Sequence, residues 1–196
     1  KGNVRKNLDF VAKKMGVERG KLILMHQTHS NKVVEINKKN YEKKVIADAM
    51  ITKLKGFALG VVTADCVPII LYDAKNKIVA CIHAGWKGAF LGIIKNTISK
   101  IKKINSDNKI YGCVGPCIGK KSYEVDKNFY IMFLAKSRNN KIYFSNKDKV
   151  KKLFNLRKFV TDELVKANIK VDQVDRDTFA EKGNFFSYRR SCKLKQ

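Results

Sequence analysis

The sequence predicts an α+β fold, in the form of a single compact domain of stacked mixed β-sheets covered by helices. Its 196 residues suit one domain, and a chain of this size buries roughly 70% of its unfolded surface. Short apolar runs typical of strands alternate with two longer segments whose apolar residues recur at helical spacing. Only two prolines occur and no segment has the composition of a linker, so residues 1–196 are interpreted as one domain.

Strands are predicted to dominate the first half of the chain. Residues 8–15 are the exception, because Leu8, Val11 and Met15 share one helical face and Gly16 follows as a stop signal. The other elements are short apolar runs, which fit strands buried on both faces. They cover residues 21–25, 32–36, 57–63, 67–72 and 78–82, with a turn over residues 73–77 before the last.

Two long amphipathic helices are predicted in the second half. They cover residues 89–104 and 149–167, where apolar residues recur at the spacing of one helical face. Three further apolar runs are interpreted as strands, over residues 110–114, 171–174 and 185–188.

Charge is the unusual feature of the composition. The chain has 42 Lys and Arg against 17 Asp and Glu, a net charge of +25. Such a field attracts anions, so nucleic acid and phosphorylated metabolites are both possible partners. Most of the excess is scattered lysine, whereas geometrically specific phosphate recognition more often uses arginine. We therefore interpret the excess as a solvated surface and keep nucleic-acid binding as the non-enzyme alternative.

The cysteines and the hydropathy pattern bear on the cellular setting. Five cysteines form no regular framework, which favours free thiols in a reducing compartment such as the cytoplasm. The longest apolar stretch, residues 57–72, is interrupted by Asp65 and is shorter than the roughly 20 residues of a membrane span. No membrane partner and no signal peptide are expected.

Three residues with chemically versatile side chains lie at the ends of predicted strands: His29, Cys66 and His83. Two imidazoles and one thiolate are a known ligand set of catalytic zinc, and three protein ligands leave one position open. Loops at strand ends often carry functional groups. The placement therefore indicates a metal site. Asp65 interrupts an apolar stretch beside Cys66 and needs a partner, so it is a candidate for orienting a ligand imidazole.

Other uses of these residues stay open at this point. Cys66 with His83 as its base could act as a thiol nucleophile without a metal. His26 could join His29 as a ligand, although no helix holds that pair, and we interpret His26 as structural. Cys81 shares a strand face with His83 and is interpreted as a core residue.

Candidate anion-binding groups lie nearby in the sequence. Gly85, Lys87 and Gly88 at a helix start resemble an anion cradle, but their spacing matches neither a dinucleotide fingerprint nor a P-loop. Arg189 and Arg190 follow an aromatic run and could hold phosphate or carboxylate, or face solvent.

Taken in order, several motifs resemble those of the YfiH family, also called laccase-domain or multicopper polyphenol oxidase-like proteins. The resemblance covers nearly all of the chain. It rests on the segments 27–30 (Gln-Thr-His-Ser), 47–49 (Ala-Asp-Ala), 63–68 (Thr-Ala-Asp-Cys-Val-Pro), 83–88 (His-Ala-Gly-Trp-Lys-Gly), 115–119 (Gly-Pro-Cys-Ile-Gly), 123–125 (Tyr-Glu-Val) and 185–190 (Phe-Phe-Ser-Tyr-Arg-Arg).

The resemblance implies stacked sheets with helices outside, in αββα layers, and one zinc ion held by His29, Cys66 and His83, with copper as the alternative metal. Family members are described as purine nucleoside phosphorylases that also deaminate adenosine and cleave methylthioadenosine. Others are described as copper polyphenol oxidases, or as cytoplasmic peptidoglycan-editing amidases that act on UDP-muramyl precursors.

This chain departs from the family pattern at several positions. Leu8 follows Asn7 where the family has an Asn-Arg pair, Lys87 replaces a usual arginine, and Asp177 precedes Thr178 where Cys-Thr is usual. The family's N-terminal segment and its final strand are expected to lie outside residues 1–196. These departures concern substrate contacts and leave the metal ligands unchanged.

The resemblance, together with the candidate metal site, therefore implies a zinc-dependent purine nucleoside phosphorylase for adenosine, inosine and methylthioadenosine, with adenosine deaminase as a side activity. Three histidines are too few to ligate several coppers, whereas a single open centre suits Lewis-acid activation. Phosphorolysis needs an anion site, for which Lys87, Arg189 and Arg190 are the candidates. Proton transfer is assigned to Asp65 or Glu124, with Cys66 as the remaining catalytic candidate. Nucleoside and phosphate are the expected partners; the amidase and the copper oxidase remain alternatives.

Overall fold

A six-stranded mixed sheet forms the centre of the computed structural model, which describes residues 2–194. Its strand order is β12-β8-β6-β7-β4-β2, antiparallel in the middle and parallel at both edges. The strands are β2 (Val33–Ile36), β4 (Ala49–Thr52), β6 (Val67–Asp73), β7 (Ile78–Ala84), β8 (Ile110–Val114) and β12 (Lys170–Gln173).

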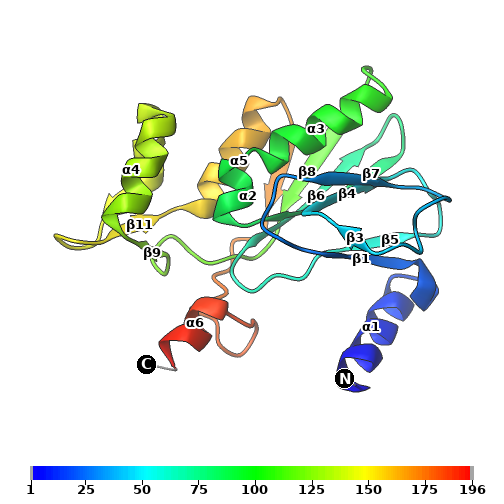
Figure 1. Ribbon diagram of the computed structural model, residues 1–196, viewed down its shortest axis with the longest axis horizontal. Coiled ribbons are helices and arrows are strands. Elements are labelled where there is room, and N and C mark those ends of the chain that lie inside the picture. The colour runs from blue at the N-terminus through cyan, green and yellow to red at the C-terminus, as the bar shows by residue number, and fades with distance from the viewer. Residues whose placement is uncertain (1, 195–196) are drawn as a thin grey trace.

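Helices α2 (Trp86–Phe90), α3 (Ile93–Ile104) and α5 (Leu156–Lys166) cover one face of this sheet (Figure 1). Ile94, Ile98 and Ile101 recur along α3 at helical spacing and are buried against the strands. We predicted that β6 is buried on both faces, and this is wrong in part. Its residues alternate between buried and accessible, and Ile70 is 59% exposed on the face away from the helices.

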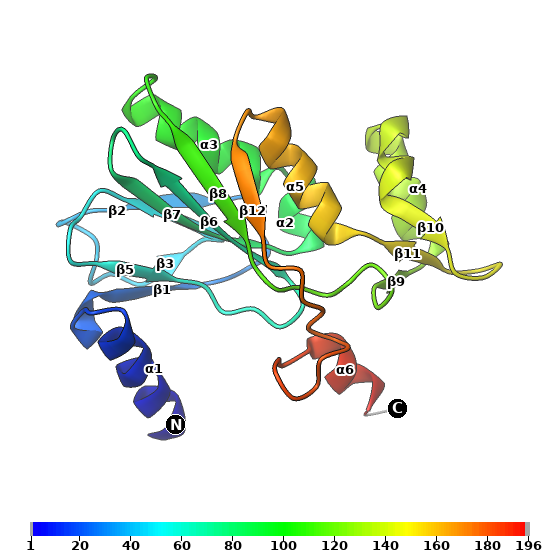
Figure 2. The ribbon, with the colours of Figure 1, turned by 180° about the vertical axis from the view of Figure 1, so that it is seen from behind.

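A smaller parallel sheet lies on the other side of the six-stranded sheet, near β4 and β7 (Figures 1 and 2). It has the order β3-β1-β5, from β1 (Leu22–His26), β3 (Val45–Ile46) and β5 (Ala58–Gly60). Ile23 and Val45 of this sheet pack against Ile36 and Met50 of the larger one. Ala12 of helix α1 (Gly2–Lys14) packs against Leu22 of β1 and Ala58 of β5, and the short 3-10 helix η1 (Arg19–Lys21) directly precedes β1.

An aromatic cluster builds the opposite end of the molecule. It joins a three-stranded antiparallel sheet to two helices: β9 (Glu124–Val125), α4 (Lys127–Lys136), η2 (Arg138–Tyr143), β10 (Phe144–Asn146) and β11 (Lys152–Phe154). Phe129 stacks on Phe133, and Phe144 stacks on Phe154, each pair with ring centroids 4.8 Å apart. This cluster is continuous with the main core through α5.

The α+β class, the stacked mixed sheets and most strands are confirmed, but three predicted elements differ. The helix predicted over 89–104 is divided at Gly92, whose φ of +91° interrupts helical geometry. The helix predicted over 149–167 begins only at Leu156, because Asn155 caps it and β11 precedes it. The strand predicted over 185–188 is absent; α6 (Tyr188–Lys193) begins there, capped by Ser187.

Candidate metal centre and the cavity beside it

His29, Cys66 and His83 meet at one end of the central strands β6 and β7 of the main sheet. β6 and β7 are antiparallel with Pro68 opposite His83, so the start of β6 and the end of β7 lie side by side. Cys66 directly precedes β6, and His83 is the penultimate residue of β7. His29 lies in the loop after β1, with a φ of +57°. Backbone strain of this kind is typical of functional loops.

The ligand atoms of these side chains lie within 4.8 Å of one another. Cys66 Sγ is 3.7 Å from Nε2 of His29, and the rings of His29 and His83 meet edge to face with centroids 4.8 Å apart. In a tetrahedral zinc site, a sulfur and a nitrogen ligand are about 3.6 Å apart. The spacing therefore fits one metal ion held by two imidazoles and one thiolate.

A buried carboxylate, Asp48, anchors two of the three ligands. Its Oδ1 accepts a hydrogen bond from the backbone N–H of His29 at 2.9 Å and lies 2.8 Å from Nδ1 of His83. Its Oδ2 accepts from both the backbone N–H and the hydroxyl of Ser30, each at 2.7 Å. Asp48 therefore fixes the His29 loop and leaves Nε2 of His83 as the ligand atom.

The protonation states of Asp48 and His83 suit metal binding. Burial opposes ionisation of Asp48, but hydrogen bonds from Ser30 and His83 outweigh burial and lower its pKa to about 2. Burial lowers the pKa of His83, although Asp48 acts in the opposite direction. His83 is then neutral at pH 7, with its proton on Nδ1 and a lone pair on Nε2, as a ligand requires. We expected Asp65 to orient an imidazole; the hydrogen bonds give that role to Asp48.

Asp65 instead ties the loop that carries Cys66 to the C-terminal segment of the chain. Its carboxylate accepts hydrogen bonds from the hydroxyl of Thr178 at 2.7 Å, the hydroxyl of Ser187 at 2.9 Å and the backbone N–H of Arg189 at 2.7 Å. Asp65 also adopts a φ of +91°, a region that L-residues rarely occupy. The partners that its carboxylate needs thus come from more than 110 residues further along the chain.

The surroundings of Cys66 disfavour the alternative of a metal-free thiol nucleophile. Burial, together with the negative charge of Asp65, raises the pKa of Cys66 to about 12. A nucleophilic cysteine needs a lowered pKa. His83, its proposed base, is hydrogen-bonded to Asp48. A bound cation would stabilise the thiolate that this environment otherwise disfavours, so the donor set fits a metal better than a thiol catalyst.

Two glycines serve close packing at this centre. A Cβ atom at Gly85 would lie 2.8 Å from Cδ2 of His29 and 3.0 Å from Sγ of Cys66. A Cβ atom at Gly88 would lie 2.8 Å from the backbone oxygen of Ser30. These positions therefore need glycine because two loops approach closely, which accounts for the spacing that resembled an anion cradle.

A cavity of about 220 Å³ opens beside His29 and Cys66. Three aromatic side chains, Trp86, Tyr123 and Tyr188, contribute to its wall, and Arg189 lies at one end. The guanidinium of Arg189 lies 5.2 Å from the centre of the Tyr123 ring and donates to the backbone oxygen of Glu124 at 2.8 Å. The cavity thus combines a candidate metal centre, flat apolar surfaces and one cation.

The other predicted anion contacts lie elsewhere. Arg190 donates to the backbone oxygens of Thr178, Phe179 and Phe185 at 2.9, 2.7 and 2.5 Å, so its guanidinium closes the loop before α6. Lys87 is exposed on α2 and does not line the cavity. Among the three predicted cations, only Arg189 lines the cavity beside the ligands.

Glu124 also lies outside this cavity. Lys147, Lys151 and Lys193 form ion pairs with its carboxylate. The hydrogen bond from Lys147, the strongest influence, helps to lower the pKa of Glu124 to about 2. Of the two carboxylates proposed for proton transfer, Asp65 alone lines the cavity.

The remaining histidine and the strand cysteine stand apart from the centre. His26 is exposed at the end of β1, opposite Ile46, and the metal-type cluster found among residues 2–194 does not include it. Cys81 is buried in β7 opposite Met50 and Ile70. The buried position of Cys81 agrees with the core role we predicted, while the structural role of His26 stays a prediction.

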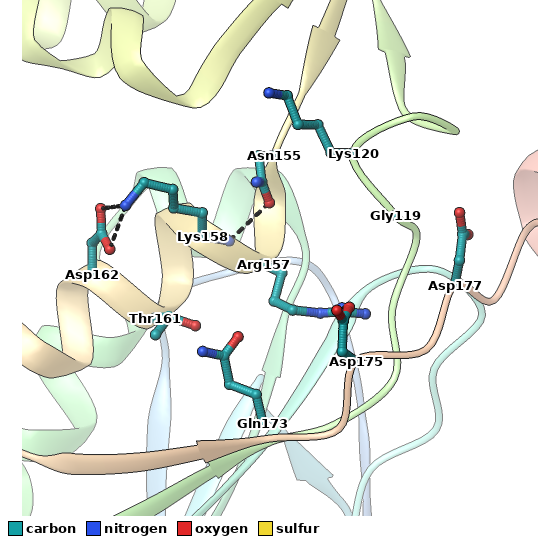
Figure 3. Close-up of a pocket in the computed structure, with 10 residues that line it drawn as sticks. All are labelled: Gly119, Lys120, Asn155, Arg157, Lys158, Thr161, Asp162, Gln173, Asp175 and Asp177. Atoms are coloured by element: carbon teal, nitrogen blue, oxygen red, sulfur yellow. Dashed lines mark hydrogen bonds and ion pairs between the residues drawn. The ribbon is translucent and has the colours of Figure 1, made fainter.

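A second cavity, of about 580 Å³, is shown in Figure 3 and adjoins the first through shared chain segments. Ile118 and Leu156 line the metal-side cavity, while their chain neighbours Gly119 and Arg157 line the larger one. Its charges cancel, because three cations face three carboxylates: Lys120, Arg157, Lys158, Asp162, Asp175 and Asp177. Arg157 pairs with Asp175, and Lys158 pairs with Asp162.

None of the helices in residues 2–194 combines the length and the apolar composition that a transmembrane helix needs.

The architecture agrees with solved structures of one class of protein. A Neisseria meningitidis protein, NMB0706, superimposes with a TM-score of 0.84 at 28% sequence identity, over 95% of this chain and 75% of that chain. The YfiH protein of Bacillus licheniformis has the same fold, with a TM-score of 0.88 at 24% identity over the same shares of the two chains. The fold is thus that of the YfiH proteins.

Sequence comparison identifies the family. Residues 1–194 match the family described as multi-copper polyphenol oxidoreductase laccase. A purine nucleoside phosphorylase of Rickettsia conorii is 36% identical over 181 residues, which are 89% of this chain and 73% of that protein. The purine nucleoside phosphorylase YfiH of Escherichia coli is 32% identical over 174 residues, 87% of this chain and 69% of that protein. The chain belongs to the YfiH, or laccase-domain, family.

Proposed function

We propose that this chain is a zinc-dependent purine nucleoside phosphorylase acting on adenosine, inosine and methylthioadenosine, with adenosine deamination as a side activity. The observation that carries the proposal is the cluster of His29, Cys66 and His83 beside a cavity with aromatic walls. Relatives at 36% and 32% identity are named purine nucleoside phosphorylases, which supports the same reaction class here. A cytoplasmic location remains a prediction.

The proposed metal ligands are His29, Cys66 and His83, with Asp48 as the residue that positions His83. When bound, the metal supplies Lewis acidity at an open coordination position. Two imidazoles and a thiolate favour zinc, and copper is the alternative. Several coppers would need more ligands than the three histidines of the sequence provide.

The rest of the cavity is proposed to bind and orient the nucleoside. Trp86, Tyr123 and Tyr188 offer ring faces on which a purine can stack. Asp65 positions the segment that carries Tyr188 and Arg189, through its hydrogen bonds to that segment. In phosphorolysis a phosphate oxygen forms a bond to C1′ of the sugar, the C1′–N9 bond breaks, and its electron pair leaves with the base, which takes up a proton.

The test is phosphate-dependent release of a base by zinc-loaded protein. Incubation with inosine and phosphate is expected to give hypoxanthine and ribose 1-phosphate in equal amounts, and omission of phosphate should abolish both. A Cys66→Ala variant prepared in parallel is the control for the metal cluster. Lack of phosphate-dependent hypoxanthine formation by zinc-loaded protein would reject the proposal.

A further inference from the structure

A third cavity, of about 270 Å³, adjoins the one beside the metal ligands. Arg189 lines both cavities. Two chain segments also run from one cavity to the other: Tyr123 lines the metal side while Glu124 lines the third cavity, and Tyr188 lines the metal side while Lys193 lines the third. A ligand in the metal-side cavity would therefore have this third cavity as its neighbour. We call it the basic cavity.

Lysine side chains gather in the basic cavity around one carboxylate. Nζ of Lys193 lies 3.3 Å from Oε1 of Glu124, and Nζ of Lys151 lies 3.5 Å from Oε2. Lys147 pairs with the same carboxylate. These lysine side chains are 39–54% exposed, whereas that of Glu124 is 14% exposed. The carboxylate is thus enclosed by ammonium groups that solvent, or a ligand, can still reach.

The charges of this region do not cancel. Three cations that line the cavity, from Lys151, Arg189 and Lys193, stand against two carboxylates, Glu124 and Asp126, which leaves 3 − 2 = +1. The Asp126 carboxylate is engaged at the start of α4, where it accepts from the backbone N–H of Phe129 at 2.7 Å.

One lysine would neutralise Glu124, so the surplus cations repel one another unless an anion joins them. The cavity of Figure 3 shows the contrasting case, because its three cations face three carboxylates.

We propose that the basic cavity is a phosphoryl-binding subsite serving the cavity beside His29, Cys66 and His83. The inference rests on the proposed function for the identity of the neighbouring site, and it assigns Lys151, Lys193 and Arg189 to the phosphoryl group. Each lysine offers an ammonium with three donors. Arg189 keeps guanidinium N–H groups beyond the one that binds the backbone oxygen of Glu124. Charge-assisted hydrogen bonds of this kind are the strong ones in phosphate recognition.

The phosphoryl group has two possible sources. It can be inorganic phosphate, which enters as the second substrate of phosphorolysis, or it can belong to the nucleotide part of a larger substrate. The chemistry that recognises it is the same. The experiment therefore uses two probes, labelled inorganic phosphate and labelled adenosine 5′-monophosphate, with unphosphorylated adenosine as the reference ligand.

Equilibrium dialysis of the zinc-loaded protein against each probe tests the subsite. The variant Lys151→Gln/Lys193→Gln removes two cations, and Lys102→Gln/Lys103→Gln removes two exposed cations from the end of α3 as a matched control. Losing two charge-assisted contacts is expected to weaken phosphate and nucleotide binding about 10-fold or more. Adenosine binding should not change, and the control variant should bind all three probes as the unmodified protein does.

A Glu124→Gln variant should change the phosphate affinity in the opposite direction. Removing the competing carboxylate raises the net charge of the basic cavity, so phosphate should bind more tightly than to the unmodified protein. Phosphate that binds together with adenosine would indicate inorganic phosphate as the source; phosphate that competes only with the nucleotide would indicate a phosphorylated substrate.

The proposal is overturned if the unmodified protein binds neither phosphate nor nucleotide, or if Lys151→Gln/Lys193→Gln binds them unchanged. Weaker phosphate binding by the Glu124→Gln variant, with its circular dichroism preserved, would also contradict it. Dialysis needs no turnover. A protein that binds phosphate at the lysines but releases no base would therefore refute the proposed function and leave the subsite standing.

Discussion

The two sides of the cavity are built in different ways. On the metal side, strand register and one buried carboxylate position the ligands: β6 and β7 pair along their whole length, and Asp48 fixes His29 and His83. On the other side, irregular segments from distant parts of the chain meet, and the hydrogen bonds that they donate to the Asp65 carboxylate hold them in place. The candidate metal ligands and the wall of the neighbouring cavity are thus positioned by separate carboxylates, Asp48 and Asp65.

The largest effect is expected from Asp48→Asn. An amide cannot accept every hydrogen bond that Asp48 accepts and would leave His83 without its negatively charged partner. Loss of such a partner typically weakens metal binding by about 10- to 100-fold. Competition with a chromophoric chelator measures the affinity. Asp73→Asn is the matched control, since Asp73 is an equally buried carboxylate at the end of β6 remote from Cys66; an equal loss of affinity in both variants would contradict this role of Asp48.

A smaller effect, confined to substrate binding, is expected from Asp65→Asn. The change weakens the hydrogen bonds to Ser187 and to the backbone of Arg189, so the segment that carries Tyr188 loses its anchor. We expect KM for the nucleoside to rise about 10-fold, in line with the loss of one or two hydrogen bonds to a charged group, while metal content is retained. Steady-state kinetics and metal analysis of the same preparation separate the two effects. Loss of the metal would show that the two sides are not independent.

The smallest effect concerns stability at low pH. Burial of Asp73 opposes its ionisation, but hydrogen bonds from Asn76 and the backbone N–H of Lys109 outweigh burial and lower its pKa. Because the folded-state pKa lies below the unfolded value of about 3.9, this stabilisation is complete above about pH 4 and is lost as pH falls through the folded-state pKa. Urea unfolding at several pH values should show the difference between the unmodified protein and Asp73→Asn shrinking below pH 4. A difference independent of pH would contradict the assignment.

Regions with regular local patterns could be predicted from the sequence. The apolar composition of the runs that form β1, β6, β7 and β8 was enough to predict them as strands. The three ligands could be predicted because each lies at or beside the end of such a run. The positioning role of Asp48 could also have been predicted, because Asp48 is a lone carboxylate between Val45 and Ile51 in a stretch that is otherwise apolar. Like Asp65, Asp48 interrupts an apolar stretch and therefore needs a hydrogen-bond partner.

The parts that could not be predicted depend on contacts between distant residues. We extended the predicted helix through residues 149–155, but pairing with β10 and β9 makes residues 152–154 the strand β11. The aromatic run at residues 185–188 fits a strand in isolation. In the folded chain, Ser187 donates a hydrogen bond to Asp65 and caps α6, so the segment leads into a helix instead. The engagement of Arg190 with three backbone oxygens likewise follows only from the folded loop.

The central claim is that His29, Cys66 and His83 hold a catalytic metal ion. The most direct measurement is the metal content of purified protein, by inductively coupled plasma mass spectrometry, for the unmodified chain, Cys66→Ala and the control Cys113→Ala. We predict about one zinc ion per chain in the unmodified protein and in the control, as a mononuclear site requires, and loss of zinc in Cys66→Ala. Full retention of zinc by Cys66→Ala would contradict the account and return Cys66 to a nucleophilic or purely structural role.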